Sequence, residues 1–336
     1  MSDFTRLVDL AAERLGGAVP LANDEFFAPR EALLRAAAPE WREGEYTDRG
    51  KWMDGWETRR RRTPGHDWCI VRLGLPGVIH GVLVDTAFFT GNYPEHCSID
   101  AAAVDGAVDP QALADDDGAW TEILPRTALR GDARNLFGIE SDRRWTHLRL
   151  NIYPDGGVAR LRVYGAAQPA WDRLLRAGGL VDLGALENGG FVVASSNAHY
   201  GNPQNMLQPG RSTHMGDGWE TRRRRGPGHD WCVIRLGRPG TLHRVELDTD
   251  HFKGNAPGSC WLEGAHSPDA GDEELEGEGV AWTPLLAQTP LRAHERHAWE
   301  SELLPHGPVT HVRISIHPDG GVARLRLLGR PAEGGA

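Results

Sequence analysis

A run of four arginines occurs twice in the chain, each time beside residues that can transfer protons. The first copy, "DGWETRRRRTPGHDWC", begins at Asp54, and the second, "DGWETRRRRGPGHDWC", begins at Asp217. The planar guanidinium of arginine binds a carboxylate through two parallel hydrogen bonds. Histidine and carboxylate side chains act as general acids or bases. Each stretch therefore has the residue types needed to bind a small anion and to do acid–base chemistry on it.

The spacing of the arginines predicts that they divide between two faces. In an extended segment successive side chains point to opposite sides, so Glu57, Arg59 and Arg61 would share one face. The residues between them would share the other face, and one arginine pair could form structural ion pairs while the other lines a pocket. The residues that we expect to bind the anion are Arg59, Arg61, Arg222 and Arg224.

The acid–base candidates lie within and after the arginine run. The "PGHDW" turn places a histidine and an aspartate at the end of a strand, where loops usually carry function. A further histidine, His199 in "SSNAHYG", pairs with Glu25 at an offset of 174, so the two copies would differ there. The candidate catalytic residues are Glu57, His66, Asp67, His199, Glu220, His229 and Asp230.

Each candidate also has a structural interpretation. An arginine run is usually a solvated or ion-paired sheet face, the aspartate can form an Asx turn, and the glutamate can be a counter-ion. A divalent metal could instead use the His, Asp and Glu groups to activate water. Their spacing matches no recognised ligand motif, so we expect no metal site and no certain cofactor.

The composition is that of an ordinary soluble protein. The chain has 336 residues, 40% hydrophobic and 25% charged, with a net charge of −10, which argues against a nucleic-acid partner. No apolar run is long enough to span a membrane, and the N-terminus lacks the apolar region of a signal peptide, so we expect a cytoplasmic protein. The four cysteines lie two per copy, 28 residues apart each time, and are expected to be buried thiols.

The whole chain is an internal repeat. Residues 54–100 and 217–263 share 29 identities in 47 positions, and residues 145–165 and 309–329 share 14 in 21. We therefore expect one domain over residues 18–166 and another over 188–330. An amphipathic helix is predicted over residues 1–17, and a linker with a short helix over 167–187.

Within each copy the hydrophobic period is two. In "WTHLRLNIYPDGGVARLRVYG", Leu148, Leu150 and Ile152 alternate with polar residues before the Pro-Asp-Gly-Gly turn. After the turn, Leu161 and Val163 face inward while the arginines, including Arg160 and Arg162, face outward. This pattern predicts a hairpin with one solvated face. Many short strands and few helices predict an all-β protein with one β-sandwich per copy.

The chain resembles the allantoicase family over almost its whole length. The resemblance is carried by "MGDGWETRRRR", "SSNAHYG", "HFKGN", "FFTGNYPEHCSIDA" and "PDGGVARLR". It implies two tandem jelly-roll sandwiches of the galactose-binding-like type, assembled into homo-oligomers. It also implies hydrolysis of allantoate to ureidoglycolate and urea, with no nucleic-acid or membrane partner. Allantoate has one carboxylate and two ureido arms, so an arginine clamp suits it.

The resemblance leaves the mechanism and the number of sites open. A His/carboxylate set in either copy could protonate the leaving ureido group and activate water. Each copy could hold one site, both copies could line one site, or one copy could be structural. The competing class is a non-catalytic tandem jelly roll that binds a small anion or a sugar, since fold alone does not give function.

Overall fold

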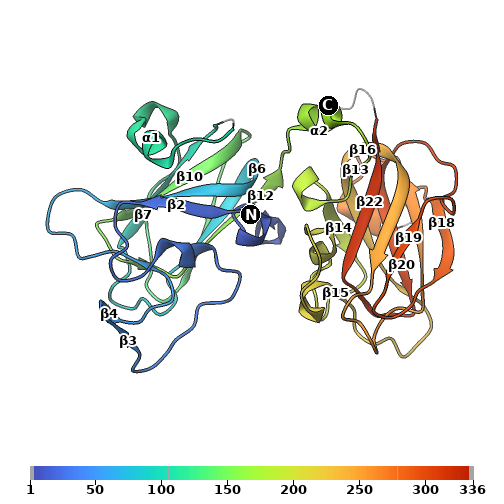
Figure 1. The fold of residues 1–336 in the computed structure, drawn as a ribbon, viewed down its shortest axis with the longest axis horizontal. Helices are drawn as coiled ribbons and strands as arrows, with labels where there is room; N and C mark the ends of the chain where they lie inside the picture. The colour runs from blue at the N-terminus through green and yellow to red at the C-terminus, as the bar shows by residue number, and fades with distance from the viewer. Residues whose placement is uncertain (1–3, 105, 278, 333–336) are drawn as a thin grey trace. The chain divides into compact units, whose positions relative to one another are not determined.

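The computed structural model describes residues 4–104, 106–277 and 279–332. The chain divides after Pro169 into two compact units, each with an eight-stranded arrangement of its own. The predicted all-β architecture of two tandem β-sandwiches is confirmed (Figure 1). Among the described residues, no helix has the length and apolar character needed to cross a membrane.

The first unit is organised around one long strand, β6 (Asp67–Asp85), which serves both layers of the sandwich. Its first half pairs with β2 and β10, and its second half pairs with β9 and β12. The strand order is β1-β12-β6-β10-β7-β8, with β2 and β9 also on β6. The partner strands are β1 (Val8–Asp9), β2 (Ala18–Ala22), β7 (His96–Ala102), β8 (Thr121–Ala128), β9 (Arg134–Gly138), β10 (Arg144–Tyr153) and β12 (Arg160–Ala167).

The second unit repeats this arrangement around β16 (Asp230–Asp248). Its order is β13-β22-β16-β20-β17-β18, with β14 and β19 also on β16. The strands are β13 (Val181–Asp182), β14 (Phe191–Ser195), β17 (Ser259–Ala265), β18 (Thr283–Pro290), β19 (Arg296–Trp299), β20 (Val309–His317) and β22 (Arg324–Pro331).

Short elements complete both units. Two-residue strands pair beside the sandwich edges, and 3-10 turns (η) join the strands. The short strands are β3 (Tyr46–Thr47), β4 (Gly50–Lys51), β5 (Trp56–Glu57), β11 (Gly157–Val158), β15 (Trp219–Glu220) and β21 (Gly321–Val322). The α-helices are α1 (Pro110–Asp115), α2 (Trp171–Ala177) and α3 (Asp272–Glu276). The 3-10 turns are η1 (Phe4–Arg6), η2 (Glu13–Leu15), η3 (Arg30–Leu34), η4 (Asp117–Ala119), η5 (Leu186–Asn188), η6 (Pro203–Leu207) and η7 (Met215–Asp217).

The predicted N-terminal helix does not form. Residues 4–17 instead make η1, β1 and η2, and β1 pairs with β12, with Val8 opposite Gly165. Residues 1–3 lie outside the described part of the chain. The second unit starts in the same way, because β13 pairs with β22 inside the segment expected to be linker. Each unit therefore begins before the predicted residues 18 and 188.

The predicted hairpin is also wrong. The strands on either side of the Pro-Asp-Gly-Gly turn, β10 and β12, do not pair with each other, because β6 lies between them. Arg160, expected on a solvated face, is 2% exposed. Its guanidinium binds the Asp54 carboxylate at 2.6 Å and the carbonyl oxygens of Ala37 and Asp54, so its charge is compensated inside the protein.

The inward-facing residues of both layers form the cores. The tryptophans that precede the two glutamates, Trp56 and Trp219, are completely buried. All four cysteines are free and buried, as expected, and burial raises the pKa of the Cys97 and Cys260 thiols to about 12. These thiols are therefore unreactive core residues.

Candidate active site

The first glutamate is held rigidly at the edge of the first sandwich. Trp56 is buried and its indole N–H donates to the Asp24 carbonyl oxygen at 2.8 Å. Glu57 pairs with Gly157 across β5 and β11, and its carbonyl oxygen accepts from the Phe27 N–H at 3.1 Å. The backbone of Glu57 is thus fixed from both sides, which orients its side chain.

Glu57 lines a cavity of about 700 Å³ in the first unit. Its Oε1 accepts a hydrogen bond from the Asn92 amide at 2.8 Å, and the side chain is otherwise shielded from solvent. Burial raises the pKa of Glu57, and the Asn92 hydrogen bond only partly opposes this shift. The other lining residues are Phe27, Thr58, Arg60, Arg61, Arg62, Gly91, Asn92, Tyr93, Glu95, Pro154, Asp155 and Gly156.

The Pro-Asp-Gly-Gly turn forms one wall of this cavity by close backbone approach. Thr58 exchanges hydrogen bonds with Gly156, whose N–H donates to the threonine hydroxyl at 3.1 Å. Gly156 has φ +139°, and a Cβ there would lie 2.7 Å from the Asn92 carbonyl oxygen. A glycine is therefore required for the turn to lie against the loop that carries Asn92.

Strand β5 ends at Glu57, so the arginines that follow do not belong to it. The arginines differ in their ion-pair partners and in whether they line the cavity. Arg59 pairs with Asp24 at 2.7 Å and does not line the cavity. Arg61 lines it, but its guanidinium is held by the buried Asp67 at 2.5 Å. Arg60 and Arg62 both line the cavity and are exposed, and neither makes an ion pair with any residue that the structure describes. Of the two, only Arg60 has a counterpart, Arg223, among the residues that line the second unit's cavity.

Arg60 is thus the anion-binding candidate that sequence reasoning missed. Arg59 and Arg61, the expected clamp, are the members of the run whose charges are compensated inside the protein. The aspartates that pair with Arg59 and Arg61 are the signal that these two arginines do not bind the ligand. Asp24 lies 35 residues before Arg59, so only the fold brings it close, and the sequence alone does not show the pair.

The predicted histidine and aspartate lie beside the cavity rather than in its lining. The His66 ring packs on the Tyr153 ring with 4.6 Å between centroids. Burial lowers the pKa of His66, and the nearby cations Arg149 and Arg61 lower it further, although a hydrogen bond with Asn151 opposes them. Asp67 also accepts from the Asn23 amide at 3.0 Å, so both of its neighbours are structural partners.

The second unit has a matching but smaller cavity, of about 360 Å³. Glu220 accepts from the Asn255 amide at 2.6 Å, and Arg223 lines this cavity as Arg60 lines the first. The other lining residues are Tyr200, Thr221, Gly254, Asn255, Ala256, Pro318, Asp319 and Gly320.

The remaining candidates of the second unit occupy the places of their first-unit counterparts. Arg224 pairs with the buried Asp230 at 2.5 Å, and His229 packs on Trp261 at 4.5 Å between centroids. Burial lowers the pKa of His229, and Arg224 adds to the effect. Arg222 is absent from the cavity lining, like Arg59.

The offset that relates the start of the two copies is 173, one less than the sequence comparison gave. Trp56 donates to the Asp24 carbonyl, and Trp219 donates in the same way to Asn197, so these two residues are equivalent. His199 therefore corresponds to Phe26 and not to Glu25. Its Nδ1 lies 3.3 Å from the Arg222 guanidinium, and neither residue lines the second unit's cavity.

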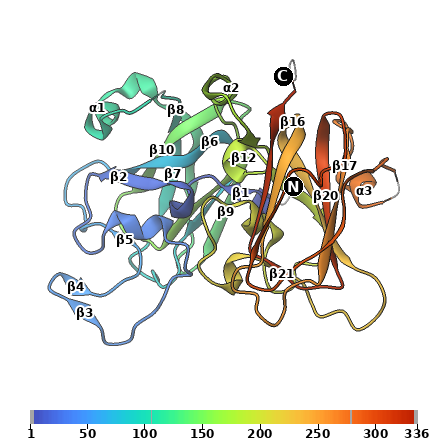
Figure 2. The same cartoon turned by 45° about the vertical axis from the view of Figure 1, so that its right-hand side comes forward.

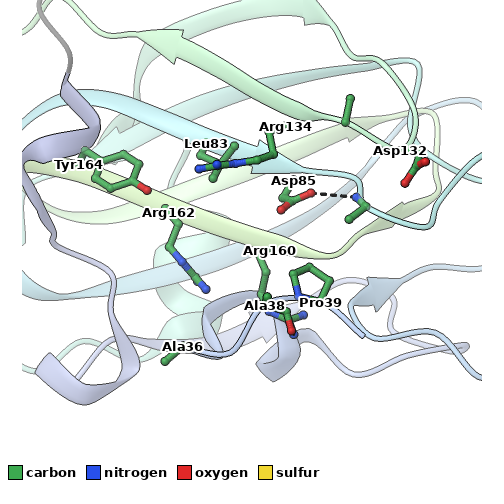
Figure 3. Close-up of a pocket in the computed structure, with 12 residues that line it drawn as sticks. Ala36, Ala38, Pro39, Leu83, Asp85, Asp132, Arg134, Arg160, Arg162 and Tyr164 are labelled. Carbon is green, nitrogen blue, oxygen red and sulfur yellow. Dashed lines mark hydrogen bonds between the residues drawn. The ribbon is translucent and has the colours of Figure 1, made fainter. Parts of the chain in front are cut away.

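The first unit contains another cavity, of about 440 Å³, which lies over β6, β9 and β12 (Figure 3). Two of its three arginines, Arg160 and Arg162, donate to the carbonyl oxygens of Leu33, Arg35 and Ala38. Asp85 accepts from the Ala87 N–H at 2.9 Å. The polar groups of this cavity are thus largely used by the fold, which favours the Glu57 cavity as the active site.

No group of three or more His, Cys, Asp or Glu residues has the arrangement of a metal site within residues 4–104, 106–277 and 279–332. In each unit the residues described above provide a cavity lined by a glutamate and by exposed arginine without a described ion pair, Arg60 and Arg62 in the first unit and Arg223 in the second. It can bind an anion and transfer a proton to a group held beside it.

Comparison with known proteins gives consistent results. The family model for the allantoicase repeat matches residues 8–168 and 181–332. The chain is 51% identical over 330 residues to a probable allantoicase 2 of Burkholderia pseudomallei, covering 98% of this chain and 96% of that protein. It is 49% identical over 328 residues to a probable allantoicase of Pseudomonas aeruginosa, covering 98% and 97%. The crystal structure of allantoicase from Saccharomyces cerevisiae superposes with a TM-score of 0.80 at 35% identity, covering 96% of this chain and 93% of that one.

Proposed function

This chain belongs to the allantoicase family, and we propose that it hydrolyses allantoate to ureidoglycolate and urea. In this reaction the bond between the tetrahedral carbon and one ureido nitrogen breaks, and a bond from that carbon to a water oxygen forms. The leaving nitrogen gains a proton and the water loses one. The observation that carries the proposal is a cavity in which an unpaired arginine and a buried glutamate line the same space.

Arg60 is proposed to bind the substrate carboxylate. Its guanidinium is free of carboxylate partners among the described residues, whereas Arg61 beside it is neutralised by Asp67. A bidentate pair between arginine and carboxylate fixes the orientation of the ligand as well as its position. Arg223 would have the same role in the second unit.

Glu57 is proposed to move the protons. Its raised pKa favours the protonated acid, which can donate to the ureido nitrogen as the bond to carbon breaks. The resulting carboxylate can then take a proton from the attacking water, which restores the acid. Asn92 holds Oε1, so Oε2 is the oxygen available for this exchange. Glu220 and Asn255 are the corresponding pair.

The histidine and aspartate pairs are proposed to position the arginines. Asp67 and Asp230 each hold the third arginine of the run, and the histidine before each aspartate packs on an aromatic ring. Their effect on catalysis would therefore pass through the geometry of the arginine run. Assembly into homo-oligomers is a further expectation, which light scattering of the purified protein would measure.

The test is urea release from allantoate by the purified protein, with and without chelator. Urea in both conditions supports hydrolysis by the residues described here. Urea only without chelator would mean that a divalent metal activates the water, so Glu57 should be re-examined as a ligand. No urea in either condition, with metals restored, would contradict the proposal and leave an anion-binding module.

A further inference from the structure

One difference between the two units concerns an acidic side chain: Glu95 lines the first cavity, and the equivalent residue of the second unit is Gly258. Their backbones are equivalent: the Glu95 N–H donates to the Tyr153 carbonyl at 3.1 Å, and the Gly258 N–H donates to the His317 carbonyl at 2.9 Å. The carbonyl oxygens of Glu95 and Gly258 accept from Leu129 and Leu291, both at 2.9 Å. The difference is therefore confined to the side chain.

The Glu95 side chain lines the first cavity without a partner of its own. It is exposed, and it makes no hydrogen bond or ion pair with any residue in the described parts of the chain. Three arginines line the same cavity, yet none of them is paired with it. An ionised carboxylate only accepts hydrogen bonds, so this group adds an acceptor to a cavity that otherwise recognises anions.

A ligand that binds Arg60, Glu57 and Glu95 at once must have a carboxylate for the arginine and N–H groups for the two glutamates. Allantoate has this distribution, because its carboxylate and two N–H-rich ureido arms are bonded to one carbon. Two arms cannot both be held by Glu57, whose Oε1 is already occupied by Asn92. A second acceptor is needed for the arm that stays on the product.

We propose that Glu95 is a specificity-determining residue that holds the retained ureido arm of allantoate, which makes the first unit's cavity the site for the two-armed substrate. This inference rests on the proposed function. In the second unit Gly258 supplies no acceptor, and the cavity of about 360 Å³ has Glu220, Asn255 and Arg223. It also has Asp319 of the turn, which accepts from the Arg224 N–H at 2.7 Å as Asp155 accepts from the Arg61 N–H in the first unit. That cavity is suited to a carboxylate with a single ureido arm.

The fold does not force this difference. A Cβ at Gly258 would lie 3.5 Å from the nearest atom within 4 Å, the His317 carbonyl oxygen, which is ordinary van der Waals contact. A side chain could therefore be accommodated there. The glutamate at position 95 is best explained by what its carboxylate binds.

The experiment compares Glu95→Gly and Glu95→Gln with the wild-type protein in steady-state urea release. Loss of a hydrogen bond to a charged group should raise KM for allantoate about 10–100-fold in E95G, with kcat within about 3-fold. E95Q, which still offers a carbonyl acceptor, should recover most of this loss. The inhibition constant of glycolate, a carboxylate without a ureido arm, should not rise in E95G.

Matched controls keep the outcomes distinct. Glu43→Gly removes another exposed glutamate, which lies outside the cavity lining, and should leave KM unchanged. If wild-type protein releases urea and E95G has the wild-type KM, the inference about Glu95 is overturned while the proposed function stands. A fall in kcat alone would also overturn it. If wild-type protein releases no urea, the proposed function itself has failed.

Discussion

The cavities of the two units share one set of lining residues and differ in another. Both cavities are lined by a glutamate that accepts a hydrogen bond from an asparagine, by an arginine without a described ion pair, and by the Pro-Asp-Gly turn. The first cavity is also lined by Phe27, Tyr93 and Glu95. The equivalent residues of the second unit are Tyr200, Ala256 and Gly258, of which Tyr200 and Ala256 line its cavity. Duplication has therefore preserved the groups proposed for proton transfer and changed the groups that would select the ligand.

An insertion in the first unit accompanies this difference. The offset between the copies falls from 173 at Asp24 to 163 at Asp54, so the first unit has ten extra residues between them. They contribute to the hairpin β3–β4, which projects from the sandwich (Figure 2). Gly50 of this hairpin lies against the Phe27 ring, whereas Tyr200, the equivalent of Phe27, is 63% exposed. The hairpin thus covers one wall of the first cavity, and the second unit lacks the insertion.

The largest expected effect separates the two glutamates. Glu57→Gln removes the group proposed to donate the proton, and we expect kcat for urea release to fall at least about 1,000-fold. The fall in kcat caused by Glu220→Gln should be at least about 100-fold smaller. Equal losses in the two variants would contradict the assignment of allantoate to the first unit.

The next effect tests whether the stability of each unit depends on a buried ion pair. Arg160 binds Asp54 at 2.6 Å, and Arg324 binds Asp217 at 3.0 Å, with all four side chains buried. Asp54→Asn removes the carboxylate that compensates the buried Arg160 and should lower the free energy of unfolding by about 3–5 kcal/mol. Asp217→Asn removes the corresponding carboxylate from Arg324. Chemical denaturation would measure both variants. Arg35→Ala, which removes a half-exposed partner of Asp54, should cost less than about 1 kcal/mol.

The anion clamp should show a smaller, unit-specific effect. Arg60→Ala removes the unpaired arginine that has a counterpart in the second cavity, and we expect KM for allantoate to rise about 10–100-fold. Arg223→Ala should raise KM less, because its cavity lacks the Glu95 acceptor. The account is weakened if the two variants raise KM equally, or if Arg59→Ala exceeds both.

The smallest effect concerns stability in acid. Burial lowers the pKa of His311 to about 4, and burial also lowers the pKa of its counterpart His147. The unfolded chain binds a proton near pH 6.5 that folded His311 does not, so stability should fall as the pH drops from about 6.5 to 4. The loss attributable to His311 should be at most on the order of 3 kcal/mol. Denaturation of His311→Gln across this range should show a flatter pH dependence, and an unchanged slope would contradict the prediction.

The fold was largely predictable because it is repetitive and locally patterned. Period-two alternation identified strands such as β10, whose residues Leu148, Leu150 and Ile152 are completely buried. The failures lie where a distant strand decides the pairing. β6 lies between β10 and β12 and prevents the hairpin, and β12 pairs with β1 where a helix was expected.

The site was predictable in residue type but not in detail. The motif identified Glu57 and the arginine run, because those residue types suit anion binding and proton transfer. It could not show that Arg59 and Arg61 are compensated while Arg60 is not, because Asp24 and Asp67 reach their partners only in the folded protein. Nor did it single out Glu95, whose importance appears only when the two cavities are compared.

The measurement that tests the account most directly is a crystal structure of the Glu57→Gln protein with allantoate bound. The account predicts allantoate in the first unit's cavity, with its carboxylate on Arg60, one ureido arm at residue 57 and the other at Glu95. Allantoate bound only in the second unit, or in the cavity over β6, β9 and β12, would contradict it.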